Sequence, residues 1–223
     1  NENVKDVYHE LFDEALAWYN EKQTRSDRRI DDYYEKIRSG KQEKPFHEII
    51  LQIGDKENMG AKTENGQLAA KVLDKYMRDF QRRNPTLRVF SAYLHMDEAT
   101  PHLHIDFVPY TTGSKRGLDT RVSLKQALSA LGFKGGTRRE TELNQWVAYE
   151  KEQMKSIYLF WTLRKRSGQR KSQNWSNLFL TEKSDYQIFR FSIEKQCRKQ
   201  SRYGRRAKQS GRKCRNFRKQ VIC

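Results

Sequence analysis

The 223-residue chain contains 35% hydrophobic and 33% charged residues, which supplies one modest core but is lean for the whole length. Its net charge of +17 at pH 7 points to a polyanionic partner, most simply nucleic acid. No apolar run approaches the roughly 20 residues of a membrane-spanning helix, and no secretory signal pattern is present, so we expect neither a membrane span nor export.

The positive charge is confined to one part of the chain. Residues 1–154 carry 25 basic and 25 acidic residues, whereas residues 155–223 carry 20 basic and 3 acidic residues. All three cysteines also lie in the second segment, so the first has no disulfide framework and a reducing, cytoplasmic location is expected. We predict a folded domain over residues 1–154 and a basic, disordered tail over residues 155–223.

Hydrophobic periodicity predicts an α+β domain, with helices flanking an antiparallel sheet. The predicted elements, in chain order, are helices over 3–26 and 26–40, a strand within 45–55, a helix over 65–85, strands over 86–98 and 101–110, and helices over 123–133 and 141–154. Trp18 and Trp146 are predicted to anchor their helices in the core, and His9 and His47 are predicted to be structural.

Three of the five histidines lie in the segment YLHMDEATPHLHIDFVPY, residues 93–110. Alternate residues of a strand share a face, so His102 and His104 point the same way. A four-residue hairpin loop over 98–101 would place His95 opposite His104, with the side chains about 5 Å apart.

The three imidazoles would then converge above the sheet, with Asp97 beside them and an apolar reverse face. Three imidazole ligands that leave open positions for substrate are typical of a catalytic metal site. The alternative is a cluster of neutral histidines without a metal, which would need many hydrogen-bond partners.

The same segment resembles the third motif of the plasmid mobilisation and recombination enzymes, the Mob/Pre or MobV-type relaxases. That motif reads His-x-Asp-Glu-x-x-Pro-His-x-His, followed by an apolar strand and a proline. Its fixed positions are present here as His95, Asp97, Glu98, Pro101, His102, His104 and Pro109. Residues 1–154 also read like this family, so the resemblance covers about two thirds of the chain.

The resemblance implies a histidine-hydrophobe-histidine endonuclease fold, with a central antiparallel sheet flanked by helices. Such relaxases nick one DNA strand at a plasmid transfer origin, where the DNA is single-stranded, and become linked to the 5′ phosphate. It implies that His95, His102 and His104 hold a divalent cation, Mn²⁺ or Mg²⁺. It further implies that Glu98 is a fourth ligand or orients the attacking residue, and that a full-length member forms a homodimer.

Four arginines in the loops downstream of the histidines are candidates for gripping DNA phosphates, which would position DNA without reading its bases. The alternative for each of them is an ordinary solvated charge. They are Arg116, Arg121, Arg138 and Arg139.

The chain also departs from the family in two ways. The motif that supplies the covalent nucleophile is expected upstream of Asn1, so we expect a fragment whose nicking activity is impaired. The tail from residue 155 lacks the Glu- and Lys-rich helices of the family. It is either a native basic arm or the product of a frameshift.

The sequence therefore predicts two alternative functions. One is a metal-dependent, site-specific single-strand endonuclease of the relaxase type. The other is a catalytically silent DNA-binding module that holds origin DNA through its loops and tail. A hydrolase of another class is disfavoured because no second carboxylate motif accompanies the histidines.

Overall fold

The computed structural model describes residues 1–136, 140–167 and 189–194 of the chain. Its main sheet has the strand order β2-β3-β1-β5, and every pairing in it is antiparallel. The strands are β1 (His47–Ile53), β2 (Leu87–His95), β3 (His102–Thr111) and β5 (Phe189–Glu194), and the two-residue β4 (Arg121–Val122) pairs with the end of β3. The predicted α+β class with an antiparallel sheet is confirmed.

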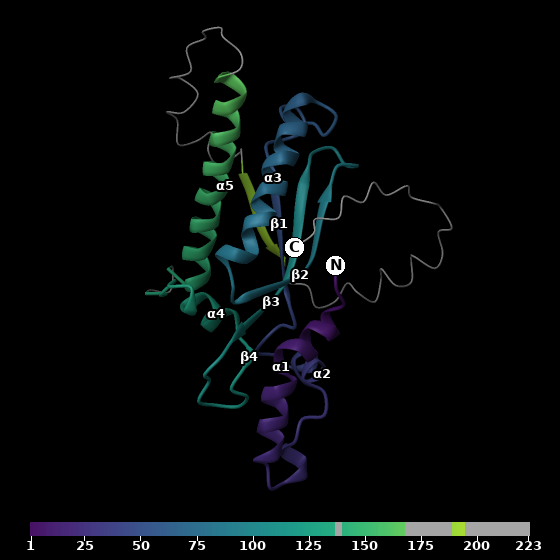
Figure 1. The fold of residues 1–223 in the computed structure, drawn as a ribbon, viewed down its shortest axis with the longest axis vertical. Coiled ribbons are helices and arrows are strands. Elements are labelled where there is room, and N and C mark those ends of the chain that lie inside the picture. Colours follow the sequence, from purple (N-terminus) through teal and green to yellow (C-terminus); the bar gives the residue numbers. More distant parts are fainter. Residues whose placement is uncertain (137–139, 168–188, 195–223) are drawn as a thin grey trace, which may run out of the picture.

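Five α-helices accompany the sheet in the described part of the chain (Figure 1). Four begin at a side chain that accepts a hydrogen bond from the first turn, as N-caps do: Asn3 for α1, Asp32 for α2, Thr63 for α3 and Ser123 for α4. The helices are α1 (Val4–Glu21), α2 (Tyr33–Ser39), α3 (Glu64–Arg83), α4 (Leu124–Ala130) and α5 (Glu142–Ser167). None of the described helices is long and apolar enough to cross a membrane.

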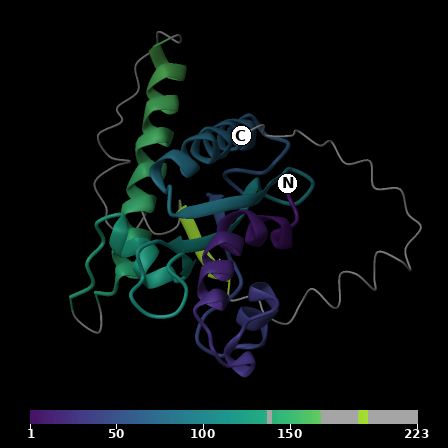
Figure 2. The same cartoon turned by 60° about the horizontal axis from the view of Figure 1, so that its bottom comes forward.

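The main core lies between one face of the sheet and helices α3, α4 and α5, which gather on that side (Figure 2). Alternate residues of β1 and β3 supply the buried apolar face, because successive side chains of a strand point to opposite faces. The fully buried side chains of this core come from both the strands and the helices. They include Ile49, Leu51, Leu103, Ile105, Phe107, Leu73, Tyr76, Phe80 and Trp146. The opposite face of the sheet is left for polar residues.

A second apolar cluster packs α1 and α2 against the far end of β3 and β4, at the end of the molecule away from the β2–β3 hairpin (Figure 1). Trp18 does not join it, because its side chain is 61% exposed and lies under the Lys22 ammonium at 5.6 Å. The prediction for Trp18 is therefore wrong. Trp146 is fully buried, as predicted, and its indole N–H donates to Asn84 at 2.8 Å.

A buried polar network joins α3 to α5. The Glu150 carboxylate is completely buried and accepts hydrogen bonds from the Tyr76 hydroxyl at 2.6 Å, Asn84 Nδ2 at 2.8 Å and Arg83 Nη2 at 3.0 Å. Burial, and then the Glu150 charge, raise the pKa of Tyr76 well above its usual value. The Glu150 carboxylate thus meets three donors, one of them cationic, which is the condition for burying a charge at tolerable cost, although Arg83 Nε itself has no hydrogen-bond partner among the described residues.

Two element boundaries differ from the prediction. The second helix begins at Tyr33 instead of residue 26, because the Asp32 side chain accepts from Glu35 N and caps it there, and Ser26–Arg28 forms only a 3₁₀ turn. Helix α5 continues past residue 154 to Ser167. Apolar side chains at helical spacing continue its buried stripe: Met154, Ile157, Tyr158 and Trp161.

The predicted boundary between residues 154 and 155 therefore falls inside α5. Strand β5 also belongs to the segment predicted to be a disordered tail, and it pairs with β1 through Leu51↔Phe191 and its neighbours. The rest of the predicted tail, residues 168–188 and 195–223, lies outside the described residues.

Candidate metal centre

The β2–β3 hairpin positions the three histidines, but its register differs from the prediction. His95 pairs with His102, and Tyr93 pairs with His104, so the loop runs from Met96 to Pro101. The predicted four-residue loop, with His95 opposite His104, is therefore wrong. The observed register of β2 on β3 differs from it by two residues.

The physical reason for the longer loop is a contact made outside the hairpin. The carbonyl of Ala99 accepts a hydrogen bond from the backbone N–H of Ala61, at 3.1 Å, just before α3 begins. Thr100 is buried at the same place. The loop residues therefore meet the start of α3 instead of closing a tight turn.

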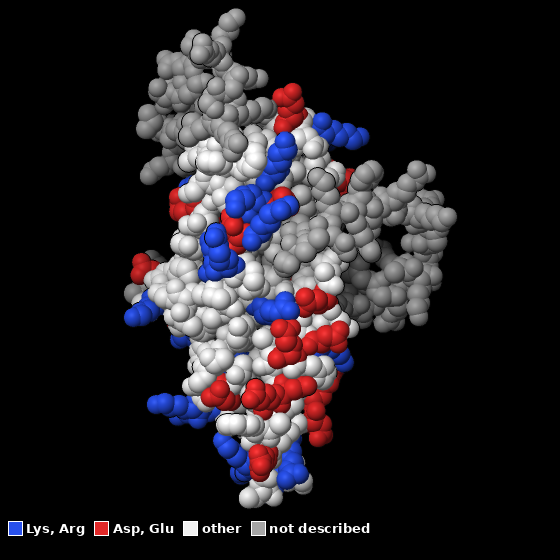
Figure 3. All heavy atoms as spheres, in the orientation of Figure 1, with Lys and Arg blue, Asp and Glu red and all other residues white. Residues whose placement is uncertain are grey.

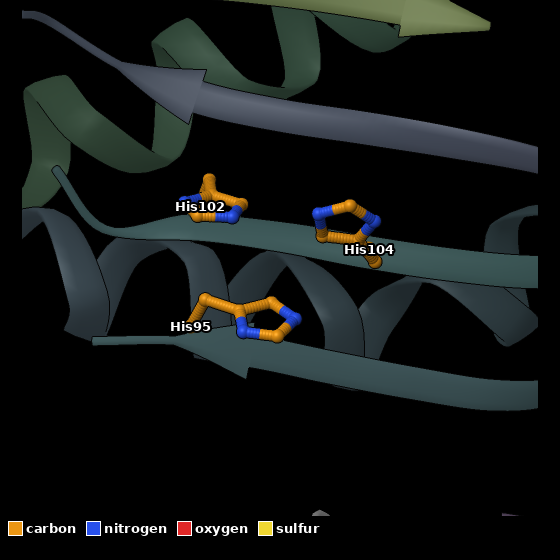
Figure 4. Close-up of side chains that lie close together, drawn as sticks. All are labelled: His95, His102 and His104. Carbon is orange, nitrogen blue, oxygen red and sulfur yellow. The ribbon is translucent and has the colours of Figure 1, made fainter. Parts of the chain in front are cut away.

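The three imidazoles converge on the polar face of the sheet, as predicted (Figure 4). Their ring centroids are 4.9 to 5.1 Å apart, and one nitrogen from each ring lies within 4.8 Å of the other two. The convergence survives the register change because His95 lies directly opposite His102 and diagonally across from His104, and both positions are in reach on a sheet face.

Hydrogen bonds orient two of the three rings. His104 Nδ1 lies 2.7 Å from Glu48 Oε1, and His102 Nδ1 lies 3.0 Å from the carbonyl oxygen of Thr100. Carboxylate and carbonyl oxygens can only accept, so Nδ1 donates in both rings, and in the neutral imidazole Nε2 is then the nitrogen whose lone pair can bind a metal ion. Metal-binding histidines are characteristically held in this way.

Glu48 is a site residue that the sequence analysis missed. It lies on β1, 56 residues before His104, and its side chain is 10% exposed. The available signal was a glutamate beside Ile49 in a strand whose alternate residues are buried. That signal places Glu48 on the polar face but does not identify its partner.

Asp106 completes this row of polar side chains. It lies opposite Glu48 on β1 and Ser91 on β2. Burial first, and the neighbouring Glu48 carboxylate second, raise the pKa of Asp106 to about 6, while a hydrogen bond from Ser91 opposes the rise. The polar face thus holds acidic groups next to His104.

Two further carboxylates lie on the hairpin loop. Glu98 Oε2 is 3.8 Å from His102 Nε2, the nitrogen that the Thr100 hydrogen bond leaves free. Asp97 Oδ1 is 3.5 Å from His95 Nδ1. Both carboxylates are mostly exposed, at 68% for Glu98 and 79% for Asp97, so their positions are less constrained than that of Glu48.

The structure does not bring Arg116 or Arg121 to the histidines. Arg121 lies on β4, which pairs with Thr111 at the far end of β3, and Arg116 is exposed in the preceding loop. Thr111 is seven residues beyond His104, or about 23 Å along an extended strand. Arg138 and Arg139 lie outside the described residues.

The other two histidines lie apart from the cluster. His9 is on α1, where Nδ1 is 3.0 Å from an Asp13 carboxylate oxygen. His47 begins β1 and stacks on Phe107, with ring centroids 6.0 Å apart. Neither has a place in the site.

A basic surface in the described part of the chain also lies away from the histidines. Figure 3 shows basic side chains over α3 and acidic side chains over α1. The exposed residues of α3 from 71 to 82 are all basic: Lys71, Lys75, Arg78 and Arg82. Helix α3 covers the apolar face of the sheet, so this basic surface lies behind the histidine face.

Comparison with known proteins matches residues 1–134 to one family model, described as plasmid recombination enzyme, Mob_Pre. No curated protein and no solved structure matches the chain. The matched region runs from α1 to α4 and includes the whole β2–β3 hairpin with its three histidines. Because it covers more than half of the 223 residues, the chain belongs to the Mob/Pre family of plasmid recombination enzymes.

Proposed function

We propose that this plasmid recombination and mobilisation protein binds a divalent cation through His95, His102 and His104. It acts on one DNA strand at a plasmid transfer origin, single-stranded at the nick, in the cytoplasm. The observation that carries the proposal is the convergence of one nitrogen from each of the three rings within 4.8 Å, with His102 and His104 oriented by hydrogen bonds at Nδ1. A purely structural histidine cluster has no need to aim three ring nitrogens at one point.

The dimensions of the cluster fit one ion after a small adjustment. Imidazole nitrogen binds a zinc-sized ion at about 2.1 Å, so two ligands of one ion lie at most about 4.2 Å apart. The cluster nitrogens lie within 4.8 Å of one another, so the rings need to close by only a fraction of an ångström. His95, which is 39% exposed, is the ring with most freedom to move.

The donor set distinguishes between the candidate ions. Three imidazoles suit transition-metal ions, whereas Mg²⁺ takes oxygen ligands and keeps much of its water. We therefore favour Mn²⁺ over Mg²⁺. Glu98, 3.8 Å from His102 Nε2, is placed to add an oxygen ligand or to orient an attacking group.

The charge around the site explains why a cation is needed. Four carboxylates surround the imidazoles: Glu48, Asp97, Glu98 and Asp106. The sequence has no lysine or arginine between Arg88 and Lys115, and Arg88, near the start of β2, is paired with Glu2 and Glu10. The part of the hairpin around the histidines therefore offers no positive charge to a phosphate. A bound cation supplies that charge and stabilises the charge that develops on phosphate oxygens during strand cleavage.

The protein residues then have separate roles. The histidines hold the cation, and Glu48 and the Thr100 carbonyl hold two of the rings in the binding orientation. Arg116 and Arg121 would contact phosphates only of a strand that extends along β3 to its far end. The covalent link to DNA needs a nucleophile, which the family resemblance expects in a separate motif.

Calorimetric titration of Mn²⁺ into the full chain tests the metal centre. We expect micromolar binding by the wild type and by His9→Ala, a histidine variant remote from the cluster. We expect no binding by the His102→Ala/His104→Ala double variant. A folded wild-type chain that binds no Mn²⁺ would overturn the proposal.

The second candidate function is a DNA-binding module without catalysis, and the 20 basic residues among residues 155–223 favour it. Conversion of supercoiled origin plasmid to the nicked form separates the two functions. Mn²⁺-dependent nicking that the double variant lacks supports the endonuclease. DNA binding that falls steeply with salt, with no nicking by either protein, supports the module.

A further inference from the structure

Tyr93 lies beside the histidine cluster, and packing in the core does not account for its position. It lies on β2 directly opposite His104, two residues before His95, and so on the same face of the sheet. Its ring centroid is 6.4 Å from that of His95. Strand β2 is at the edge of the described sheet, so Tyr93 has a neighbouring strand on one side only.

The exposure of Tyr93 is unusual for an aromatic residue in this sheet. The residue is 48% exposed, whereas Phe107 on β3 is completely buried and Phe90 on β2 packs edge-on against Phe46 at 5.4 Å. The other large apolar side chains that are exposed in the described part of the chain lie on α1 and α5. An aromatic ring is thus presented to solvent on the histidine face.

We propose that Tyr93 is a stacking platform for one base of the single strand whose phosphate the histidine site engages. This inference rests on the proposed function and specifies how the site holds its substrate. The Tyr93 ring is next to the imidazole of His95. If the cation at the histidines binds a phosphate, the Tyr93 ring is within reach of the base of the adjoining nucleotide. Bases stack on exposed tyrosine without regard to sequence, because every base has an aromatic face.

The charge of the surroundings favours stacking over ionic contact as the means of holding DNA here. Between Val89 and Ser114 the chain carries Asp97 and Glu98 and no lysine or arginine, so a phosphate next to the one at the cation meets acidic side chains of the hairpin loop. A neutral aromatic ring can hold a neutral base in this acidic setting. The strand would therefore be bound by its phosphate at the histidines and by its base at Tyr93.

The hydroxyl of Tyr93 raises a competing role, in which the phenol itself donates a hydrogen bond to DNA or attacks the phosphate. The two roles differ in what they require of the side chain. Stacking needs the ring and not the oxygen, so Tyr93→Phe preserves it. Tyr93→Thr removes the ring and keeps a residue that favours strands, which limits the effect on folding.

The test compares two single-stranded probes of equal length, an oligothymidylate and an oligomer of abasic deoxyribose phosphates. Binding to the full chain is measured with Mn²⁺ by fluorescence anisotropy, at a salt concentration that suppresses contacts by the basic tail. We expect Tyr93→Thr to weaken oligothymidylate binding by about 5- to 150-fold, the usual effect of losing one base–aromatic stack. We expect Tyr93→Phe and Trp18→Ala, a second exposed aromatic far from the site, to bind as the wild type does.

The abasic probe and the metal titration identify the cause of any change. Tyr93→Thr should bind the abasic oligomer as the wild type does, and should keep its Mn²⁺ affinity. Equal weakening with both probes would overturn stacking, and so would loss of affinity or nicking in Tyr93→Phe. If Mn²⁺ binds and Tyr93→Thr has no effect, stacking fails while the metal centre stands; absence of Mn²⁺ binding in the wild type is instead the failure of the proposed function.

Discussion

Two polar clusters lie on opposite sides of the same sheet, and they are built on opposite principles. The Glu150 carboxylate, between α3 and α5, is fully buried, and three donors meet it. The histidine cluster is partly exposed, and one nitrogen from each ring lies within 4.8 Å of the other two. Donors that surround one buried acceptor mark a structural polar group, whereas oriented rings that converge on one point mark a binding site.

The largest expected effect is on stability and comes from the buried Glu150 network. Glu150→Ala leaves Arg83 buried without its carboxylate, together with donors from Tyr76 and Asn84, and should lower the free energy of unfolding by about 3–5 kcal/mol. Denaturant unfolding measures it. Glu152→Ala, which removes a 65% exposed carboxylate two residues along α5, should change the stability by no more than about 0.5 kcal/mol. Equal effects of the two variants would contradict the structural role of Glu150.

The next effect in size comes from the histidine side and depends on the cation. Mn²⁺ at about 100 times its dissociation constant should stabilise the folded chain by about 2.7 kcal/mol, because it binds only the folded state. Thermal unfolding with Mn²⁺ and with a chelator measures the difference. The His102→Ala/His104→Ala variant should show none, and a Mn²⁺ stabilisation that persists in this variant would locate the bound ion elsewhere.

A smaller effect should come from the residue that orients His104. Loss of a hydrogen-bond partner behind a metal ligand typically costs 10- to 100-fold in metal affinity, so Glu48→Ala should weaken Mn²⁺ binding by about that factor. Glu48→Gln should restore part of it, because the amide oxygen can still accept from Nδ1. If Glu48→Gln is as weak as Glu48→Ala, the carboxylate contributes its charge and not the orientation of His104. Calorimetry of both variants decides.

The smallest effect should come from Asp97. Its carboxylate is 79% exposed and lies 3.5 Å from His95 Nδ1, and exposed pairs of this kind contribute at most about 1 kcal/mol. Asp97→Asn should therefore change Mn²⁺ affinity by less than about fivefold in the same calorimetric titration. A loss as large as that of Glu48→Ala would instead make Asp97 a metal ligand and would break the distinction between buried and exposed carboxylates.

Local pattern was enough to predict the fold class and the convergence of the three histidines. The alternation of His102, Leu103, His104 and Ile105 places two imidazoles on one face and the apolar residues on the other. His95 stays on the same face because the register differs from the prediction by two residues, an even number. The register itself was not predictable, because the Ala61–Ala99 hydrogen bond that lengthens the loop joins residues 38 apart in sequence.

Long-range pairing also explains the remaining differences. Glu48 became a site residue only when β1 was aligned with β3, which no local spacing reveals. The extension of α5 was hidden because high positive charge suggested disorder, although Ile157, Tyr158 and Trp161 continue an apolar stripe. Trp18 has the spacing of a core residue, but no element of the described structure packs over its side of α1.

The contact between the hairpin loop and the start of α3 makes the geometry of the metal centre depend on residues outside it. Gly66, in the first turn of α3, lies so close to the carbonyl of Gly60 that a side chain there would displace the Gly60–Ala61 backbone. That backbone holds Ala99, and the next carbonyl, of Thr100, holds the ring of His102. The geometry of the cation site therefore depends partly on Gly66, a residue that does not contact the ion. A substitution at the start of α3 can alter the site although every ligand is still present.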